Sequence, residues 1–487
     1  MKKNFEMNMC EGKIFGKLVV YALPLVLTNV LQLLFNAADV AVLGIFVSDD
    51  AVAAVGATGA LINLVIGLFV GLSVGANVLV ARFSGEQNVD SAHKTVGTSV
   101  IVSLITGVIL AFIGYFFAET FLEWTKCDPD VLDMATKYLK IYFIGMPIMM
   151  LYNFCASILR AVGDTMRPLI FLIIGGVVNI GLNIFFILVL DKTVEGVAIA
   201  TVVSQGISAV LSVIVLLKSK GYAKLDLKKF RIYMPELKEM VRIGLPAGLQ
   251  GCVFSISNVL IQSTINTFSK TYMTANTVAS QFDGFIYNAM NAVALSCLAF
   301  VSQNYGARKF DRIRTVVRQS VLLVTVIGLV IGGGVILFSA QLCGLITDDP
   351  EIIRIAQNRL YILASTYFTC GIMDVLSNFM RGLGKSTTAM IVSLSGSCLF
   401  RIIWLKTVYL LNPTIEMVYI VYPISWVLTI GVYMIMYFPT LNHAKKEVTK
   451  AEAEIGNNET EKTELENKEI ENRELEEADA VAEAEKC

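Results

Sequence analysis

Asp39 is a carboxylate inside an apolar run that is long enough to cross a lipid bilayer. The run begins at Val19 and reads VVYALPLVLTNVLQLLFNAADVAVLGIFV. A charged side chain at the centre of such a helix costs about 2.5–3.5 kcal/mol on insertion scales, and such residues usually face a protein interior or a water-filled cavity. A proton or a small cation would neutralise the carboxylate, so the residue suggests cation binding.

Three further charged residues lie in apolar segments of the second half of the chain. Asp283 in TVASQFDGFIYNAM and Arg401 in CLFRIIWLKTVYLL have similar predicted depths, so we expect a buried ion pair between them. Asp374 lies about two helical turns before Arg381 and is a candidate for binding a cationic substrate or a proton. The alternative for Asp374 is neutral burial or solvation from a water-filled cavity.

The composition indicates an all-α polytopic membrane protein. Of the 487 residues, 55% are hydrophobic and only 16% are charged, and the mean hydropathy is +0.66, whereas about a quarter of the residues of a soluble domain are charged. Nine cysteines include no CxxC pair, and there are only two histidines. These counts argue against a disulfide framework, a zinc site and a histidine-ligated metal centre.

Hydropathy predicts twelve transmembrane helices, with boundaries uncertain by a few residues. They are expected at 19–47, 51–81, 95–118, 131–159, 168–190, 194–217, 243–268, 274–301, 315–338, 352–380, 387–410 and 415–438.

The short loops alternate in charge, which predicts orientation. Basic loops include the one with Arg82 and Lys94 and the connection 218–242, whereas the opposite loops are acidic or nearly neutral. We therefore expect a multi-pass protein of the plasma (inner) membrane with both termini in the cytoplasm. The N-terminus lacks the cleavage site of a removable signal peptide.

Short strings recur at a separation of about 221 residues, which predicts an internal repeat. Pro24 in YALPLVLTNVLQ recurs as Pro246 in IGLPAGLQ, and ARFSGEQN with Gly85 recurs as SQNYGARK with Gly306. The predicted parts are two pseudo-symmetric six-helix lobes, a basic cytoplasmic linker and a disordered acidic cytoplasmic tail. They cover residues 1–217 and 243–440 for the lobes, 218–242 for the linker and 441–487 for the tail.

These strings together resemble the multidrug and toxic compound extrusion (MATE) family, and its DinF-like prokaryotic branch in particular. The paired loops LRAVGDTMRP and MRGLGKS, the string GLPAGLQ and the Asp of the first span carry the resemblance, which covers roughly residues 14 to 440. It implies efflux of cationic amphipathic compounds, driven by a Na⁺ or H⁺ gradient through alternating access.

The resemblance also implies a cation-coupling site in the first lobe, at Asp39, Asn179, Asn183 and Thr201. Asn183 departs from the family pattern, which has an Asp at that position, so we expect the site to take one cation at a time. Asn179 and Asn183 are four residues apart and project from one helix face, where their oxygens could join Asp39 around Na⁺ or stabilise its protonated form. The alternative for the two Asn residues is hydrogen bonding between helices.

Two questions stay open from the sequence. Coupling could belong to Asp39, or to Asp283 or Asp374 in the second lobe. The function could also be that of a flippase for a lipid-linked precursor, although the mostly acidic intramembrane charges favour the exporter. We expect no enzymatic activity, no cofactor besides the coupling ion, no metal beyond Na⁺ at Asp39, no nucleic-acid partner, and a monomer surrounded by lipid.

Overall fold

The computed structural model describes residues 6–125 and 127–484, and in this part of the chain the secondary structure is helical without strands. The helices of the first half are α1 (Ile14–Phe46), α2 (Asp49–Gly85), α3 (Val89–Trp124), α4 (Pro129–Ile144), α5 (Met146–Ala161), α6 (Met166–Leu188) and α7 (Val194–Lys218). Those that follow are η1 (Leu227–Lys229), α8 (Met234–Ile265), α9 (Lys270–Gly306), α10 (Phe310–Leu337), α11 (Ser339–Gly344), α12 (Pro350–Ala364), α13 (Tyr367–Gly382), α14 (Ser386–Ser393), η2 (Leu394–Leu399), α15 (Phe400–Lys406), α16 (Val408–Leu411) and α17 (Ile415–Ala484).

The predicted twelve-helix membrane fold is confirmed. Within the described residues, ten helical segments are each long and apolar enough to cross a membrane, and two bent helix pairs raise the total to twelve when each pair counts as one span. The pairs are α4 with α5, bent by 52°, and α12 with α13, bent by 41°. Each bent pair corresponds to one predicted span, 131–159 and 352–380.

The two bends occur at equivalent positions of the repeat. Gly145 and Thr366 stand at the breaks and are 221 residues apart. At the first break Pro147 supplies no backbone N–H, which weakens helical continuity. At the second, the Thr366 hydroxyl donates to the Ile362 carbonyl at 2.9 Å, a local bond that competes with regular helix geometry. Different residues thus accompany a bend at the equivalent position of each half.

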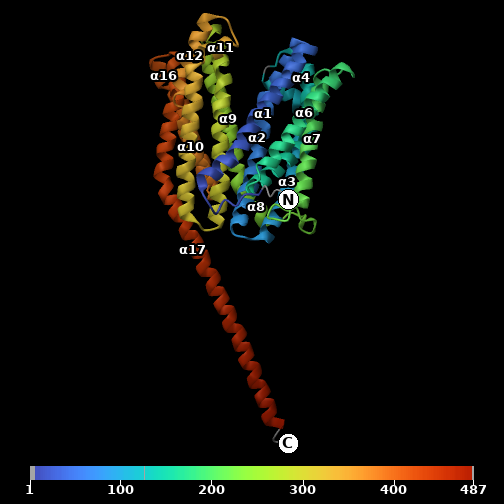
Figure 1. Cartoon of the computed structure of the whole chain (residues 1–487), viewed down its shortest axis with the longest axis vertical. Helices are drawn as coiled ribbons and strands as arrows, with labels where there is room; N and C mark the ends of the chain where they lie inside the picture. Colours follow the sequence, from blue (N-terminus) through green and yellow to red (C-terminus); the bar gives the residue numbers. More distant parts are fainter. Residues whose placement is uncertain (1–5, 126, 485–487) are drawn as a thin grey trace. The chain divides into compact units, whose positions relative to one another are not determined.

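The two halves meet through glycines near the ends that carry the basic loops, which we call the basic end. Figure 1 shows the helices of the first half, in blue to green, beside those of the second half, in yellow to red. A Cβ added to Gly85 would lie 1.9 Å from the Gln303 oxygen, and one added to Gly306 would lie 2.0 Å from the Arg82 oxygen. Gly85 and Gly306 are 221 residues apart, and so are the residues that they contact, Arg82 and Gln303. The contact between the halves therefore follows the internal repeat.

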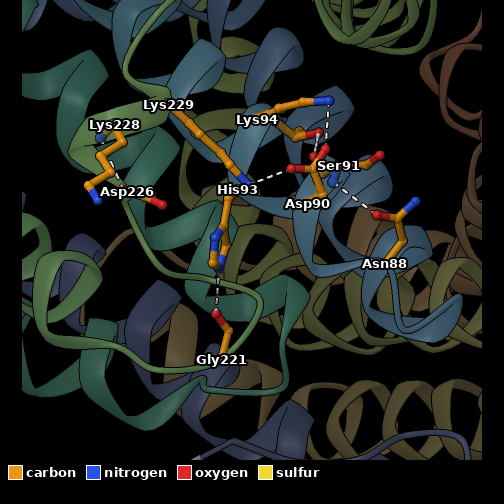
Figure 2. A network of polar contacts seen from close by, with 10 residues as sticks. Asn88, Asp90, Ser91, His93, Lys94, Gly221, Asp226, Lys228 and Lys229 are labelled. Atoms are coloured by element: carbon orange, nitrogen blue, oxygen red, sulfur yellow. Dashed lines mark hydrogen bonds and ion pairs between the residues drawn. The ribbon is translucent and has the colours of Figure 1, made fainter.

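The linker 218–242 is held against the start of α3 (Figure 2). His93 Nε2 lies 3.1 Å from the Gly221 carbonyl, and Lys229 Nζ lies 2.5 Å from Asp90 Oδ1. Lys94 reaches the other oxygen of Asp90 at 2.6 Å. Because these charges are exposed, we assign them an orienting role more than a stabilising one.

The segment before α1, residues 6–13, touches both halves. The Met7 amide donates to the Val162 carbonyl of the first half at 3.2 Å. The Met9 amide donates to Gln303 of the second half at 2.7 Å, and Arg312 donates to the carbonyls of Met9 and two neighbouring residues at 3.1–3.2 Å. This N-terminal segment therefore bridges the halves at the basic end.

By contact density the chain divides into two compact units, Met1–Ile435 and Met436–Cys487. Both predicted lobes, 1–217 and 243–440, thus fall almost entirely within one unit. Helix α17 continues to Ala484, through the tail that the sequence predicts to be disordered. The tail is rich in Glu, Lys and Ala, which have high helix propensity and explain the helical backbone. The predicted domain boundaries stay predictions.

Candidate functional site

The structure brings together the four residues predicted for the first-lobe site. Asp39 of α1 is 8% exposed and accepts a hydrogen bond from the Asn183 amide of α6 at 2.5 Å. The Thr201 hydroxyl of α7 lies 3.5 Å from the other oxygen of Asp39. Asn179 donates to Thr201 at 3.4 Å and accepts from Asn183 at 3.4 Å. Three helices therefore contribute to one polar cluster.

Small residues on α6 let the three helices approach closely enough to form this cluster. A Cβ added to Gly176 would lie 1.9 Å from the ring of Phe35 on α1. One added to Gly175 would lie 2.5 Å from the Ser208 hydroxyl of α7. Both glycines precede Asn179 by one turn, so they set the spacing of the helices directly beside the polar side chains.

The cluster contains a buried oxygen that lacks a partner among the described residues. The Asn183 Oδ1 is buried and accepts no hydrogen bond from the residues that the structure describes, whereas the Asn183 amide nitrogen donates to both Asp39 and Asn179. A buried acceptor without a partner is unfavourable. A carboxylate with adjacent amide and hydroxyl oxygens suits a hard monovalent cation, and a proton on Asp39 would turn the carboxylate into a donor.

In the second half, the predicted ion pair between Asp283 and Arg401 is wrong. Asp283 of α9 pairs with Arg359 of α12 at 2.6 Å, and both side chains are almost fully buried. Helix α12 packs along α9 and places Arg359 beside Asp283. The sequence does carry a signal for this pair, because Arg359 is a charge inside the predicted span 352–380 and therefore needs a partner.

Asp374 lines a cavity of about 460 Å³ in the second half. Asn378 and Arg381 follow it on the same face of α13, at the i, i+4 and i+7 positions, and also line the cavity. Arg381 donates to Gln250 of α8 at 2.8 Å and to Asn378 at 3.4 Å, and it interacts electrostatically with Asp374. Arg381 directly follows the predicted span 352–380, so the hydropathy pattern gives no sign that it lies in a cavity.

Arg401 lines the same cavity from α15 and is 3% exposed. Its Nε donates to the Ser425 hydroxyl at 3.0 Å, and its guanidinium lies 4.4 Å from the centre of the Tyr422 ring. The π-helix η2 directly precedes α15, and π-helical turns are frequent at functional sites. Of the three residues predicted for the second lobe, the cavity therefore joins Asp374 and Arg401, while Asp283 lies in a separate ion pair.

Comparison with known proteins decides the family. The family model described as MatE matches residues 24–185 and again 246–405, one match in each half. The chain belongs to the MATE family. The double match confirms the internal repeat, whereas the DinF-like branch stays a prediction.

Relatives and solved structures agree with this MATE assignment. The chain is 28% identical to the probable multidrug resistance protein YoeA of Bacillus subtilis, over 79% of this chain and 84% of that protein. It is 25% identical to the probable multidrug resistance protein NorM of Thermotoga maritima, over 80% of this chain and 85% of that protein. A MATE family transporter solved in an outward-facing conformation superposes with a TM-score of 0.84 at 22% identity, covering 92% of this chain and all of that one. This MATE protein is therefore a membrane transporter of the multidrug efflux family, which handles small molecules.

Proposed function

We propose that this chain exports amphipathic cationic compounds and couples their efflux to inward movement of Na⁺ or H⁺ at Asp39. The observation that supports this proposal is the cluster of Asp39, Asn179, Asn183 and Thr201. In it a buried carboxylate accepts from the Asn183 amide nitrogen, while the Asn183 oxygen has no hydrogen-bond partner among the described residues. A bound cation would neutralise the buried charge of Asp39 and give the Asn183 oxygen a partner. Because the site has a single carboxylate, it takes one cation at a time.

Alternating access supplies the coupling. The glycine contacts close the two halves at the basic end, and the proposed cycle separates them there and closes them at the other end. A cation bound at Asp39 favours drug release on the outer side, and drug binding on the inner side resets the transporter. In this proposal the chain acts as a monomer in the plasma membrane with both termini in the cytoplasm, and it has no enzymatic activity.

The test is dye transport into proteoliposomes. A fluorescent cationic dye is added with either an imposed Na⁺ gradient or an imposed pH gradient, and one of the two is expected to drive transport. Asp39→Asn should reduce driven transport roughly 10-fold or more, in line with ordinary coupling free energies. Ser212→Ala is the matched control, because Ser212 is a buried hydroxyl of the same half that donates only to its own helix.

Two results would contradict the proposal. Transport that depends on neither gradient would exclude the antiporter. Full driven transport by Asp39→Asn would move the coupling to the second half, to Asp374 or Asp283.

A flippase for a lipid-linked precursor is the alternative. Such a protein needs a broad cationic groove for phosphate groups, and Arg381 and Arg401 do place two cations in the second-half cavity. Arg381, however, is already engaged by Gln250 and Asn378 and lies beside Asp374. One remaining arginine is a site for a single anionic group, which favours a small-molecule exporter.

A further inference from the structure

The linker between the two halves exposes several large apolar side chains at residues 227–234, which we call the linker segment. Leu227 and Met234 are each 70% exposed, Phe230 is 42% exposed and Ile232 is 39% exposed. Apolar side chains that are exposed side by side on a surface mark sites of interaction with proteins or membranes. The linker segment therefore presents an interaction surface.

Two other residues of the linker segment hold it against the start of α3. Lys229 forms an ion pair with Asp90 at 2.5 Å (Figure 2). The Tyr233 amide donates to the Thr98 hydroxyl at 3.1 Å, and Lys94 Nζ lies 5.6 Å from the centre of the Tyr233 ring. Because these two side chains turn toward α3, the exposed apolar side chains are left on the opposite side of the segment, away from the bundle.

The contact with α3 also sets the depth of the linker segment in the membrane. A Cβ added to Gly97 would lie 3.6 Å from the Phe230 Cα, and the Thr98 hydroxyl donates to the Arg231 carbonyl at 3.4 Å. Gly97 and Thr98 belong to the first turn of the predicted span 95–118. The segment is therefore level with the end of a transmembrane span, where lipid headgroups meet the acyl chains.

The linker carries a surplus of positive charge at this depth. Residues 218–242 include eight Lys and Arg residues and three Asp and Glu residues. Lys228 and Arg231 lie among the exposed apolar side chains and are themselves exposed. Within the described part of the chain, neither forms an ion pair with an acidic side chain. Basic segments with exposed apolar side chains bind in the plane of an anionic bilayer surface.

We propose that the linker segment is a membrane-interface anchor that binds the headgroups of anionic phospholipids. Its four exposed apolar side chains enter the boundary between headgroups and acyl chains, and Lys228 and Arg231 contact the lipid phosphates. The linker joins α7 of the first half to α8 of the second, so the anchor holds the covalent connection between the halves at the bilayer surface. This inference concerns a lipid partner and does not depend on the export proposal.

Quenching of a fluorescent label tests the depth of the linker segment. Leu227→Cys, made in the full chain without its native cysteines, is labelled with bimane and placed in nanodiscs of phosphatidylcholine and phosphatidylglycerol. Nitroxide groups near the top of the lipid acyl chains report contact with the bilayer, and iodide reports contact with water. We expect strong quenching by the nitroxide lipids and weak quenching by iodide.

The same label measures the preference for anionic lipid. At equal mole fraction, nitroxide carried by phosphatidylglycerol should quench more than nitroxide carried by phosphatidylcholine. Lys228→Gln combined with Arg231→Gln should reduce this preference by roughly 5-fold or more, because two attractions to phosphate are lost. Arg314→Gln is the matched control, because Arg314 is an exposed cation at the basic end but lies on α10. It should leave the preference unchanged.

Two results would overturn the inference. Quenching by iodide without quenching by the nitroxide lipids would mean that the linker segment lies in water, where its apolar surface would serve a protein partner. Equal quenching by the two nitroxide lipids, unaffected by the double substitution, would mean that the exposed cations do not bind anionic headgroups. Neither result bears on the export proposal, because that proposal is tested by driven dye transport.

Discussion

Gly248 of α8 is a position where a single methyl group should directly disturb contact between the halves. A Cβ built there lies 2.1 Å from the Leu68 oxygen and 2.8 Å from the Leu68 carbonyl carbon of α2. Both obstacles are backbone atoms, so no side-chain rotation relieves the clash. For Gly248→Ala the shortest distance must widen from 2.1 Å to about 3.4 Å, which requires the two helices to move apart.

This displacement has a calculable effect on conformation. Overpacking in a tight interface costs about 1–3 kcal/mol, which corresponds to a change of roughly 5- to 150-fold in an equilibrium between two arrangements. The arrangement that is closed at the basic end should lose population by that factor. Driven dye transport should fall as well, because the proposed cycle passes through this arrangement.

The assay is disulfide formation between Ser84→Cys and Gln303→Cys in a background without native cysteines. These side chains are joined by a hydrogen bond of 3.1 Å across the interface. Gly251→Ala is the matched control on the same helix, because a Cβ at Gly251 meets nothing within 4 Å. Both substitutions share the gain in helix propensity, about 1 kcal/mol, so their difference isolates the clash. Equal cross-linking yields in the two variants would refute the reasoning.

Three further perturbations have defined outcomes. Asp283→Asn should lower the free energy of unfolding by about 3 kcal/mol in detergent melts. The double variant with Arg359→Gln should lose less stability than the sum of the two single losses. Additive losses would contradict the ion pair. Arg312→Ala should release the N-terminal segment and speed alkylation of Cys10. The Cys10 thiol is buried, and this burial is the main cause of its raised pKa. An unchanged alkylation rate would mean that the segment stays bound. Gly176→Val should push α1 away from α6 and abolish driven dye transport, while binding of the cationic dye in the second-half cavity persists. Normal transport would show that the first-half cluster tolerates this displacement.

Much of this architecture follows from local sequence properties. Each predicted span needs only a continuous apolar run, and each broken span reads as a single segment because its break is short. The repeat is visible because equivalent glycines and prolines, such as Gly85 and Gly306, recur at a constant separation. Asn179 and Asn183 share a helix face through their spacing alone, and the family resemblance connected them with Asp39 and Thr201.

Contacts between helices depended on the tertiary structure. The partner of Asp283 is Arg359 and not Arg401, since pairing depends on which helices adjoin and how each is rotated, whereas hydropathy indicates only approximate depth. The same reason explains why Arg381, which follows the predicted span 352–380, lies in a cavity, and why the segment before α1 bridges both halves. A sequence pattern specifies the position of a charge along its own helix, but the neighbour that neutralises it is selected only when the helices pack.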